Sequence, residues 1–195
     1  MTTLEKTNLR KQLRAQRRAL SDAAQKVASR DLDRRLRKLT PARRAGHIAF
    51  YLPNDGEISP LLTLRRMARQ QHACYLPCLA GKALIFRRFH PGQKLRRNRF
   101  NIPEPPQRRG NARPAHKLDV IFLPLVGFDT QGNRLGMGGG FYDRTLSHLP
   151  RQKTRRPLLV GLAHDFQQVE RLPVQSWDIP LDVIATDRRL YWLSR

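Results

Sequence analysis

The sequence predicts a protein of the α/β class, in which helices cover both faces of a largely parallel sheet. Short apolar runs alternate with amphipathic or turn-rich segments along nearly the whole chain. The most apolar run, residues 120–126, is typical of a strand buried on both faces. With 195 residues, of which 39% are hydrophobic, the chain is long enough to form one domain around a sizeable core.

Two helices are predicted at the N-terminus, over residues 3–20 and 21–39. Leucines at helical spacing form an apolar stripe along the first helix. Ser21 is a suitable N-cap for the second helix, and Thr40-Pro41 is predicted to end it. Three basic side chains stand four residues apart on one face of the first helix: Lys6, Arg10 and Arg14. These cations either clamp an anion or form a solvated face.

The remaining strands and helices alternate along the rest of the chain. Helices are predicted near residues 60–71 and over 141–149, a basic turn at 151–156 and a loop at 174–180. Strands are predicted at 47–52, 73–79, 83–89, 120–126, 157–163, 182–186 and 189–193. Residues 90–117 contain five prolines and show no clear periodicity, so we expect a loop with little regular structure. Such a loop is often functional, and a flexible surface strap is the alternative.

The net charge of +23 is concentrated in two segments. Residues 1–44 hold 14 Lys and Arg against 4 Asp and Glu, and residues 81–117 hold 11 against 1. Residues 118–150, in contrast, are nearly neutral. A basic surface favours anionic partners such as nucleotides, polycarboxylates, nucleic acid or anionic membrane. A merely solvated basic face is the alternative.

Several classes of protein are excluded by what the sequence lacks. No apolar run approaches the roughly 20 residues that cross a bilayer, and the N-terminus has no apolar segment of a secretory signal. Cys74 and Cys78 lack a second ligand pair at metal-binding spacing, so we interpret them as ordinary thiols in a reducing cytoplasm. No Ser, Cys or His stands in a triad-like pattern. Chemistry by positioning and charge neutralisation, as in phosphoryl transfer, is therefore favoured.

A glycine-rich segment over residues 134–144, R-L-G-M-G-G-G-F-Y-D-R, lies between the most apolar strand and a predicted helix. Its G-x-G-G-G pattern matches neither the dinucleotide fingerprint nor the P-loop, so alone it indicates only a tight turn. Its context favours an anion site, because glycines let the backbone approach an anion and a helix start offers free N–H groups. Arg134 and Arg144 flank the segment and are candidates for stabilising charge during catalysis.

Three acidic residues stand at positions suited to ligand binding. Asp143 directly follows the glycines, and Mg²⁺ beside a phosphate is typically held by one or two carboxylates. Asp178, in a loop between predicted strands, is the candidate for the second carboxylate. Glu57 follows a strand and a turn, where a ligand contact is well placed. A turn, capping or helix-start role is the alternative for each of them.

The segment L-P-L-V-G-F-D-T-Q-G-N-R-L-G-M-G-G-G-F-Y-D-R, residues 123–144, closely resembles the signature of the 5-formyltetrahydrofolate cyclo-ligase family. Shorter segments similar to the family's stand in the family's order, at 6–10, 52–58, 100–105, 161–163 and 177–178. The resemblance implies one domain over residues 1–195. It would be a three-layer α/β/α sandwich with a mostly parallel, Rossmann-like central sheet.

The resemblance also implies an activity: conversion of 5-formyltetrahydrofolate to 5,10-methenyltetrahydrofolate through a phosphorylated imidate, with ATP consumed and Mg²⁺ required. Asp143 and Asp178 would hold the Mg²⁺. The ATP-binding residues would be Lys6, Arg10, Arg134, Leu135, Gly136, Met137, Gly138, Gly139, Gly140, Phe141 and Tyr142. The folate-binding residues would be Leu52, Glu57, Phe100, Met137, Gly138, Gly139, Gly140 and Phe141.

The glycine segment departs from the family pattern at two positions. Met137 and Gly139 stand where other members carry basic or aromatic residues, so arginines and Lys6 must supply more of the charge. Phe100 stands where a tryptophan is common, and it can stack but cannot donate through an indole N–H. Neither departure removes a group that the implied reaction needs.

A second hypothesis is a nucleic-acid-binding protein that uses the basic segments 1–44 and 81–117. No helix-turn-helix, zinc or RRM pattern accompanies these segments. We favour the cyclo-ligase. Its expected partners are ATP and 5-formyltetrahydrofolate, with or without a polyglutamate tail, and we expect a cytoplasmic monomer that does not associate with membrane.

Overall fold

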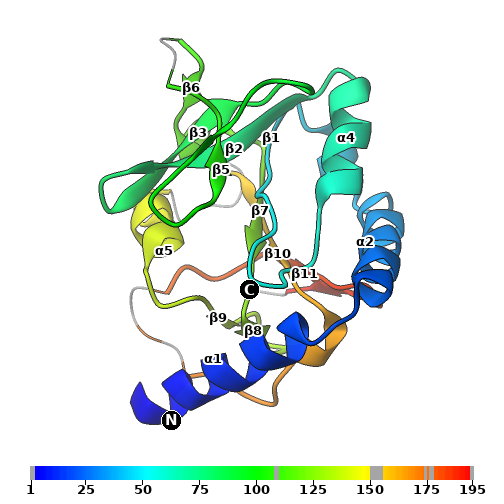
Figure 1. Cartoon of the computed structure of the whole chain (residues 1–195), viewed down its shortest axis with the longest axis vertical. Coiled ribbons are helices and arrows are strands. Elements are labelled where there is room, and N and C mark those ends of the chain that lie inside the picture. Colours follow the sequence, from blue (N-terminus) through cyan, green and yellow to red (C-terminus); the bar gives the residue numbers. More distant parts are fainter. Residues whose placement is uncertain (1–2, 108–109, 150–155, 174, 176–177, 194–195) are drawn as a thin grey trace.

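An eight-stranded sheet forms the centre of the molecule (Figure 1). The computed structural model describes residues 3–107, 110–149, 156–173, 175 and 178–193. In sheet order, the strands are β12 (Leu190–Trp192), β11 (Val183–Ala185), β10 (Leu158–Leu162), β7 (Val120–Pro124), β1 (His47–Ala49), β2 (Ala73–Ala80), β3 (Ala83–Arg88) and β6 (Ala112–Arg113).

The five strands from β11 to β2 run parallel, and β12, β3 and β6 add to the edges in antiparallel fashion. β7 is central: Val120 pairs with Ile48 on one side and with Leu158 on the other. Its residues 120–123 are all buried, as expected for a strand covered on both faces. The predicted α/β class and its largely parallel sheet are therefore confirmed.

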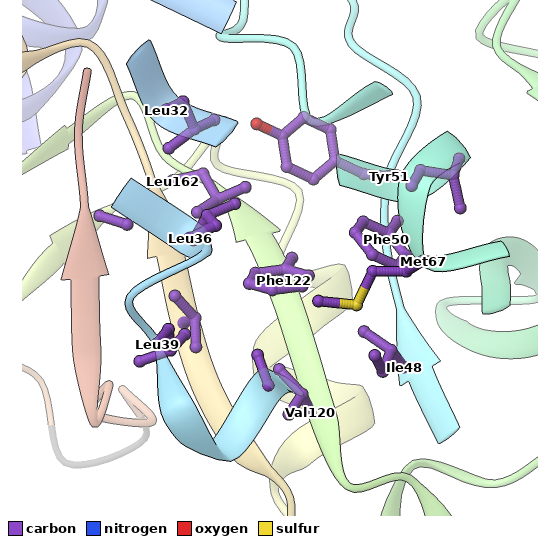
Figure 2. Close-up of a cluster of buried hydrophobic side chains, with 14 of the residues drawn as sticks. Leu32, Leu36, Leu39, Ile48, Phe50, Tyr51, Met67, Val120, Phe122 and Leu162 are labelled. Carbon is purple, nitrogen blue, oxygen red and sulfur yellow. The ribbon is translucent and has the colours of Figure 1, made fainter. Parts of the chain in front are cut away.

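Helices flank the sheet on both sides, and Figure 1 shows α2 and α4 together opposite α5. The helices are α1 (Thr3–Arg18), α2 (Asp22–Leu36), α3 (Thr40–Arg44), α4 (Leu61–Arg69) and α5 (Phe141–Leu146). α2 and α4 cover one face, where Leu36 and Met67 pack around Phe122 of β7 (Figure 2). On the other face, Leu146 of α5 joins a second core cluster with Ile121. No helix in the described part of the chain is long and apolar enough to cross a membrane.

α1 lies across one end of the sheet, close to the two-stranded ribbon of β8 (Gly127–Phe128) and β9 (Arg134–Leu135) in Figure 1. Its Leu13 is buried in a third apolar cluster with Val126 and Leu135, which belong to this ribbon and its approach. The predicted N-terminal helix thus packs against the chain segment that leads into the glycine-rich loop.

Two local predictions are corrected by the structure. The second helix ends at Leu36, and Thr40-Pro41 begins the short helix α3 rather than ending α2. Proline is compatible with this place because the first turn of a helix leaves its N–H groups unpaired in any case.

The segment 90–117 is more regular than its composition predicts. It forms a ribbon of β4 (Arg96–Arg97) and β5 (Pro103–Glu104), the edge strand β6, and a 3₁₀ turn η1 (Ala115–Lys117). Backbone pairing with β3 orders a sequence that has no periodicity of its own. A further 3₁₀ turn, η3 (Asp165–Gln167), follows β10. Of the predicted basic turn and the 174–180 loop, positions 151–155, 174 and 176–177 lie outside the described residues.

Candidate active site

A cavity of about 900 Å³ opens where the parallel strands β1, β2 and β7 reach their carboxyl ends. Leu52 follows β1, Leu76 lies in β2, and Leu123 lies in β7, and together they provide part of its apolar floor. α1 and the glycine-rich loop close the cavity from the other side. Ligands of open α/β sheets characteristically bind in this position, outside the carboxyl ends of the strands.

The structure brings nearly all the predicted site residues together around this one cavity. They come from α1, from the turn after β1, from the 98–104 loop, from the glycine-rich segment and from the loop before β11. The predicted residues in the cavity wall are Lys6, Arg10, Leu52, Glu57, Phe100, Arg134, Leu135, Gly136, Met137, Gly138, Gly139, Gly140, Phe141, Tyr142, Asp143 and Asp178.

The glycine-rich loop takes a conformation that requires glycine at two of its positions. Gly138 and Gly140 have φ of 91° and 63°, in the left-handed region where other L-residues are strained. Gly140 is also the N-cap residue, directly before the first residue of α5. From α1, Arg10 Nε donates a hydrogen bond of 2.9 Å to the Gly136 carbonyl, so this cation holds the loop as well as lining the cavity.

Arg144 lies outside the described cavity wall, in contrast to the expectation that it supplies charge to the site. Its Nε donates to the Lys82 carbonyl at 2.6 Å, and its guanidinium also donates to the Gly139 carbonyl. The same group lies 5.4 Å from the centre of the Phe141 ring. Arg144 therefore braces the loop from behind. Arg134 is the loop arginine that faces the cavity.

Arg134 is almost buried and is already paired with an acid. Its side chain is 8% exposed, forms an ion pair with Asp143 and donates a hydrogen bond to the Ile179 carbonyl. Burial lowers the pKa of Arg134, and the charges of Asp143 and Asp178 oppose this shift. Two carboxylates and one guanidinium thus share the wall of the cavity beside the glycines.

The two acids proposed as metal ligands differ in their surroundings. Asp143 is 30% exposed and paired with Arg134, whereas Asp178 Oδ2 accepts a hydrogen bond of 2.8 Å from the Gln175 N–H. In the described ranges, no group of three or more His, Cys, Asp or Glu side chains is arranged to hold a metal ion. Two carboxylates fit Mg²⁺, which usually binds one or two of them and completes its octahedron with water and phosphate oxygens.

Glu57 reaches the cavity from the turn after β1. Burial of its carboxyl group raises the pKa of Glu57 to about 7, with Arg17 and the Asn54 N–H acting in the opposite direction. The Asn54 N–H donates to Glu57 Oε2 at 3.1 Å. Gly56, with φ of 76°, lies so close to α1 that a Cβ there would be 2.7 Å from the Arg17 carbonyl oxygen. The turn is therefore packed directly against the N-terminal helix.

Phe100 sits at the tip of the 98–104 loop and is 48% exposed. Its ring meets Phe141 of the glycine-rich segment edge to face, with ring centres 5.8 Å apart. Asn98 shapes the tip: its side-chain oxygen accepts from the Phe100 N–H at 2.8 Å, and its amide donates to Glu104 at 2.6 Å. This part of a proline-rich segment is thus ordered, and it presents an aromatic face at the cavity.

Comparisons with known proteins agree with this arrangement. The model of the 5-formyltetrahydrofolate cyclo-ligase family matches residues 2–187. The chain belongs to the 5-formyltetrahydrofolate cyclo-ligase family. It is 40% identical over 184 residues to the cyclo-ligase of Haemophilus influenzae, covering 93% of this chain and 97% of that protein. It is 40% identical over 183 residues to that of Escherichia coli K12, covering 92% and 98%.

A solved structure shows the same fold in this family. The NMR structure of Aquifex aeolicus 5,10-methenyltetrahydrofolate synthetase superposes with a TM-score of 0.82 at 34% identity, covering 97% of this chain and 93% of that one. The resemblance seen in the sequence is thereby confirmed, as is the class of enzyme. The chain is an ATP-dependent ligase of folate one-carbon metabolism.

The cavity wall also contains residues that the sequence analysis did not name as candidates. Most lie in loops or strands whose pattern indicates burial rather than function: Tyr51, Asn54, Asp55, Leu76, Pro77, Leu79, Leu84, Asn98, Ile102, Pro103, Glu104, Leu123, Pro124, Leu172, Pro173 and Gln175. No spacing rule distinguishes them, because strands far apart in the chain meet only in the folded sheet.

The third cation of the predicted α1 stripe is used within the protein. Arg14 Nε pairs with Asp55 Oδ2 at 2.7 Å, whereas Lys6 and Arg10 line the cavity. Arg17 was missed altogether, and it is completely buried beneath this stripe. A sequence signal for it exists: position 17 is one helical turn after Leu13, on the face that the leucine stripe marks as buried.

Proposed function

We propose that the chain cyclises 5-formyltetrahydrofolate to 5,10-methenyltetrahydrofolate with MgATP as co-substrate, and that the cavity at the carboxyl ends of β1, β2 and β7 is its active site. The observation that carries this proposal is that one cavity brings together two sets of lining residues, which we call its two walls. The first wall is formed by Lys6, Arg10 and Arg134 with the glycine-rich loop, and the second by Leu52, Glu57 and Phe100. Its volume of about 900 Å³ lies at the upper end of small-molecule sites.

The first wall suits a nucleotide triphosphate. Lys6 and Arg10 project from α1 toward a loop whose glycines allow phosphate oxygens to approach the backbone of residues 136–142. Arg134 adds a third cation. In phosphoryl transfer, catalysis depends on such positioned charges, which neutralise the charge of the transferring group.

Asp143 and Asp178 are the residues that would hold Mg²⁺ on this wall. The ion supplies charge neutralisation at the β- and γ-phosphates when it is bound. In the free protein, Arg134 neutralises Asp143. We propose that Arg134 turns from Asp143 to a phosphate oxygen when nucleotide binds. The phosphate then provides a negative charge for Arg134, and Mg²⁺ provides a positive charge for Asp143.

The second wall suits the reduced pterin. Leu52 provides an apolar surface, Phe100 an exposed aromatic ring, and Glu57 a hydrogen-bonding carboxyl group among buried atoms. An ionised Glu57 accepts hydrogen bonds from the N–H groups of the pterin. The centre of the glycine-rich loop, residues 137–141, lies between the two walls and contacts both ligands in our proposal.

The reaction needs no nucleophile from the protein. The N5-formyl oxygen attacks the γ-phosphorus and ADP leaves, which converts the amide into a phosphorylated imidate with a far more electrophilic carbon. N10 then attacks that carbon, loses its proton, and the ring closes as phosphate departs. Cys74 and Cys78 fit this scheme as bystanders, because burial raises the pKa of these thiols to about 11 and about 12.

A spectroscopic assay tests the activity. The purified chain should produce the methenyl chromophore from 5-formyltetrahydrofolate only when Mg²⁺ and ATP are both present, with one phosphate released per product. The control reactions omit either ATP or Mg²⁺. Absence of product with active reduced substrate, or ATP hydrolysis that does not depend on folate, contradicts the proposal.

The remaining sequence predictions extend this proposal. We propose that residues 1–195 act as one cyclo-ligase domain, supported by the family match over 2–187 and by one continuous sheet. The protein is a cytoplasmic monomer in our proposal. The nucleic-acid hypothesis for segments 1–44 and 81–117 has the net charge of +23 in its favour. Affinity for RNA or DNA that falls steeply with salt at physiological ionic strength supports it, and absent binding dismisses it.

A further inference from the structure

Arg17 is a completely buried arginine whose hydrogen bonds tie α1 to the floor of the site. Its Nε donates to the Asp55 carbonyl at 2.7 Å, its Nη2 to Asp55 Oδ2 at 2.7 Å, and its Nη1 to the Leu125 carbonyl at 3.1 Å. Burying a guanidinium is costly unless it is paired and hydrogen-bonded. All three of its nitrogens are satisfied here, which indicates a built position rather than an accident of packing.

The same guanidinium reaches both walls of the cavity. Nη2 lies 3.9 Å from Glu57 Oε1 on one side and 3.6 Å from the Met137 sulfur on the other. Glu57 and Met137 both line the cavity, whereas Arg17 stands behind them. A single rigid side chain thus spans from the turn that carries Glu57 to the centre of the glycine-rich loop.

We propose that Arg17 is a positioning residue, which fixes Glu57 and the centre of the glycine-rich loop relative to each other across the cavity. The inference rests on the proposed function for its kinetic consequences. The effect of Arg17 on the pKa of Glu57 does not depend on the reaction and is measured separately.

The groups around Glu57 define what the loss of Arg17 does. From α1, Arg17 and Arg14 face the carboxyl group; from its own turn, Asp55 and the Asn54 N–H do so. Tyr51, which follows β1, and Tyr142 of α5 interact with it from the other sides. Arg17 is the leading cause that lowers the Glu57 pKa against burial. Without Arg17, we expect the pKa of Glu57 to rise further and its carboxyl group to lose the positive charge that faces Oε1.

Arg18 provides a matched control on the same helix. It pairs with the same acid, Asp55, through Oδ1 at 3.5 Å, but its side chain is 51% exposed. Arg18→Gln removes one positive charge, as Arg17→Gln does. The glutamine at position 17 keeps an amide that donates toward the buried carbonyls, which favours a folded variant, and Arg17→Lys keeps the charge without the planar fork.

The first experiment observes Glu57 directly, by NMR titration of the protein labelled with ¹³C at the glutamate side-chain carboxyls. The chain has few glutamates, at positions 5, 57, 104 and 170. Glu57→Gln therefore identifies the relevant signal. In Arg17→Gln we expect the Glu57 midpoint to rise by about 1 pH unit, and in Arg18→Gln we expect little change. An unchanged midpoint in folded Arg17→Gln overturns the proposal. This test stands even if the wild-type protein makes no methenyl product.

The second experiment uses steady-state kinetics and a double mutant. Arg17→Gln and Arg17→Lys should raise KM for 5-formyltetrahydrofolate by about tenfold, because the substrate loses about one hydrogen bond to the charged Glu57 carboxylate. KM for ATP should change much less. On the Glu57→Gln background, the same substitutions should add little. A uniform loss of kcat that is additive with Glu57→Gln indicates a merely structural role and overturns the proposal. If Arg17→Gln does not fold, Arg17→Lys decides by the same criterion.

Discussion

At the scale of single residues, two of the acids in the cavity wall form ion pairs with arginines of the protein. Arg134 forms an ion pair with Asp143, and Asp55 forms ion pairs with Arg14 and Arg17. These pairs prevent buried charges from standing alone, which would cost several kcal/mol each. In our proposal, ligand binding exchanges the partners of such a pair, and the acid that loses its arginine gains a cation at the same time.

Asp143 is the residue whose substitution tests this exchange. We expect Asp143→Asn to reduce turnover at saturating ATP by at least about a hundredfold, because a neutral amide cannot neutralise a divalent cation beside the phosphates. Calorimetric titration with Mg²⁺ and a non-hydrolysable ATP analogue should show weaker binding. Asp22→Asn, in the exposed first turn of α2, is a suitable control. Asp182→Asn is not, because the carboxylate of Asp182 pairs with Arg156. Wild-type-like turnover in Asp143→Asn refutes the metal assignment.

Glu57 predicts a pH dependence of stability with a definite sign. Burial raises the pKa of Glu57 from 4.5 to about 7, so the folded state binds more protons than the unfolded state between these values. Its contribution to stability is present below pH 4.5 and is lost as the pH rises through about 7. The energy involved is on the order of 3 kcal/mol.

Glu57→Gln should therefore gain stability relative to the wild type as the pH rises, because glutamine has no charge to bury. Urea unfolding at pH 5 and pH 8 measures the difference between the two proteins at each pH. We expect the free energy of unfolding of Glu57→Gln, relative to that of the wild type, to be higher at pH 8 than at pH 5. A gap that is the same at both pH values contradicts the shifted pKa of Glu57.

At the scale of elements, the glycine-rich loop is held from three directions. β9 pairs with β8, Arg10 of α1 binds the Gly136 carbonyl, and Arg144 of α5 binds the Gly139 carbonyl. Thr145 fastens α5 itself to β3, because its hydroxyl accepts from the Leu84 N–H at 2.8 Å. A loop that consists mostly of glycine is thus held in a position where its backbone can be presented to an anion.

Substitution of Gly140 tests the conformation of this loop. A Cβ at Gly140 would lie 2.6 Å from Arg144 Nη1, and φ there is 63°. We expect Gly140→Ala to lower the free energy of unfolding by about 1–2 kcal/mol and to weaken ATP binding. Gly136→Ala is the control for stability, since a Cβ there meets no atom within 4 Å. Equal stability of the two variants in urea contradicts the strained conformation.

At the scale of the whole molecule, the sheet separates its functional end from its core. The cavity lies at the carboxyl ends of the parallel strands, and the apolar clusters lie on the two faces behind it. Phe122 of β7 is completely buried and packs on Phe50, with ring centres 4.9 Å apart. In Figure 2 its ring lies between Leu36 and Met67, so one side chain joins the strand to both helices.

Phe122 is therefore expected to dominate the stability of this face. Phe122→Ala should lower the free energy of unfolding by about 3–5 kcal/mol, through lost burial and the cavity that remains. Val27→Ala on the exposed side of α2, where the side chain is 53% exposed, should change it by less than about 0.5 kcal/mol. Urea denaturation compares the two, and a small effect of Phe122→Ala refutes the central position of this ring in the core.

Local patterns in the sequence were sufficient for the class of fold, and together with the family resemblance they named most of the residues that gather at the cavity. The apolar run at 120–126 predicted the central strand, because a strand buried on both faces excludes polar residues from either side. The glycines at 136–140 predicted a close backbone approach, since positive φ leaves few alternatives. Helical spacing placed Lys6 and Arg10 on one face of α1, and only the family resemblance distinguished a ligand-binding role from a solvated face. Each of these signals lies within a short stretch of chain.

Contacts between distant segments were decided only in the tertiary structure. Arg17 was not singled out in the sequence, and the partners that satisfy it when buried are Asp55 and Leu125, which other elements bring beneath α1. Arg144 stands beside the glycines in sequence, but its side chain does not line the cavity, because its guanidinium donates a hydrogen bond to the Lys82 carbonyl. Periodicity reports which face of an element is buried, whereas the partner that satisfies a buried charge is chosen by packing across the sheet. For this protein the sequence indicated which segments gather at the cavity, and the fold determined which of their side chains line it and which hold the others in place.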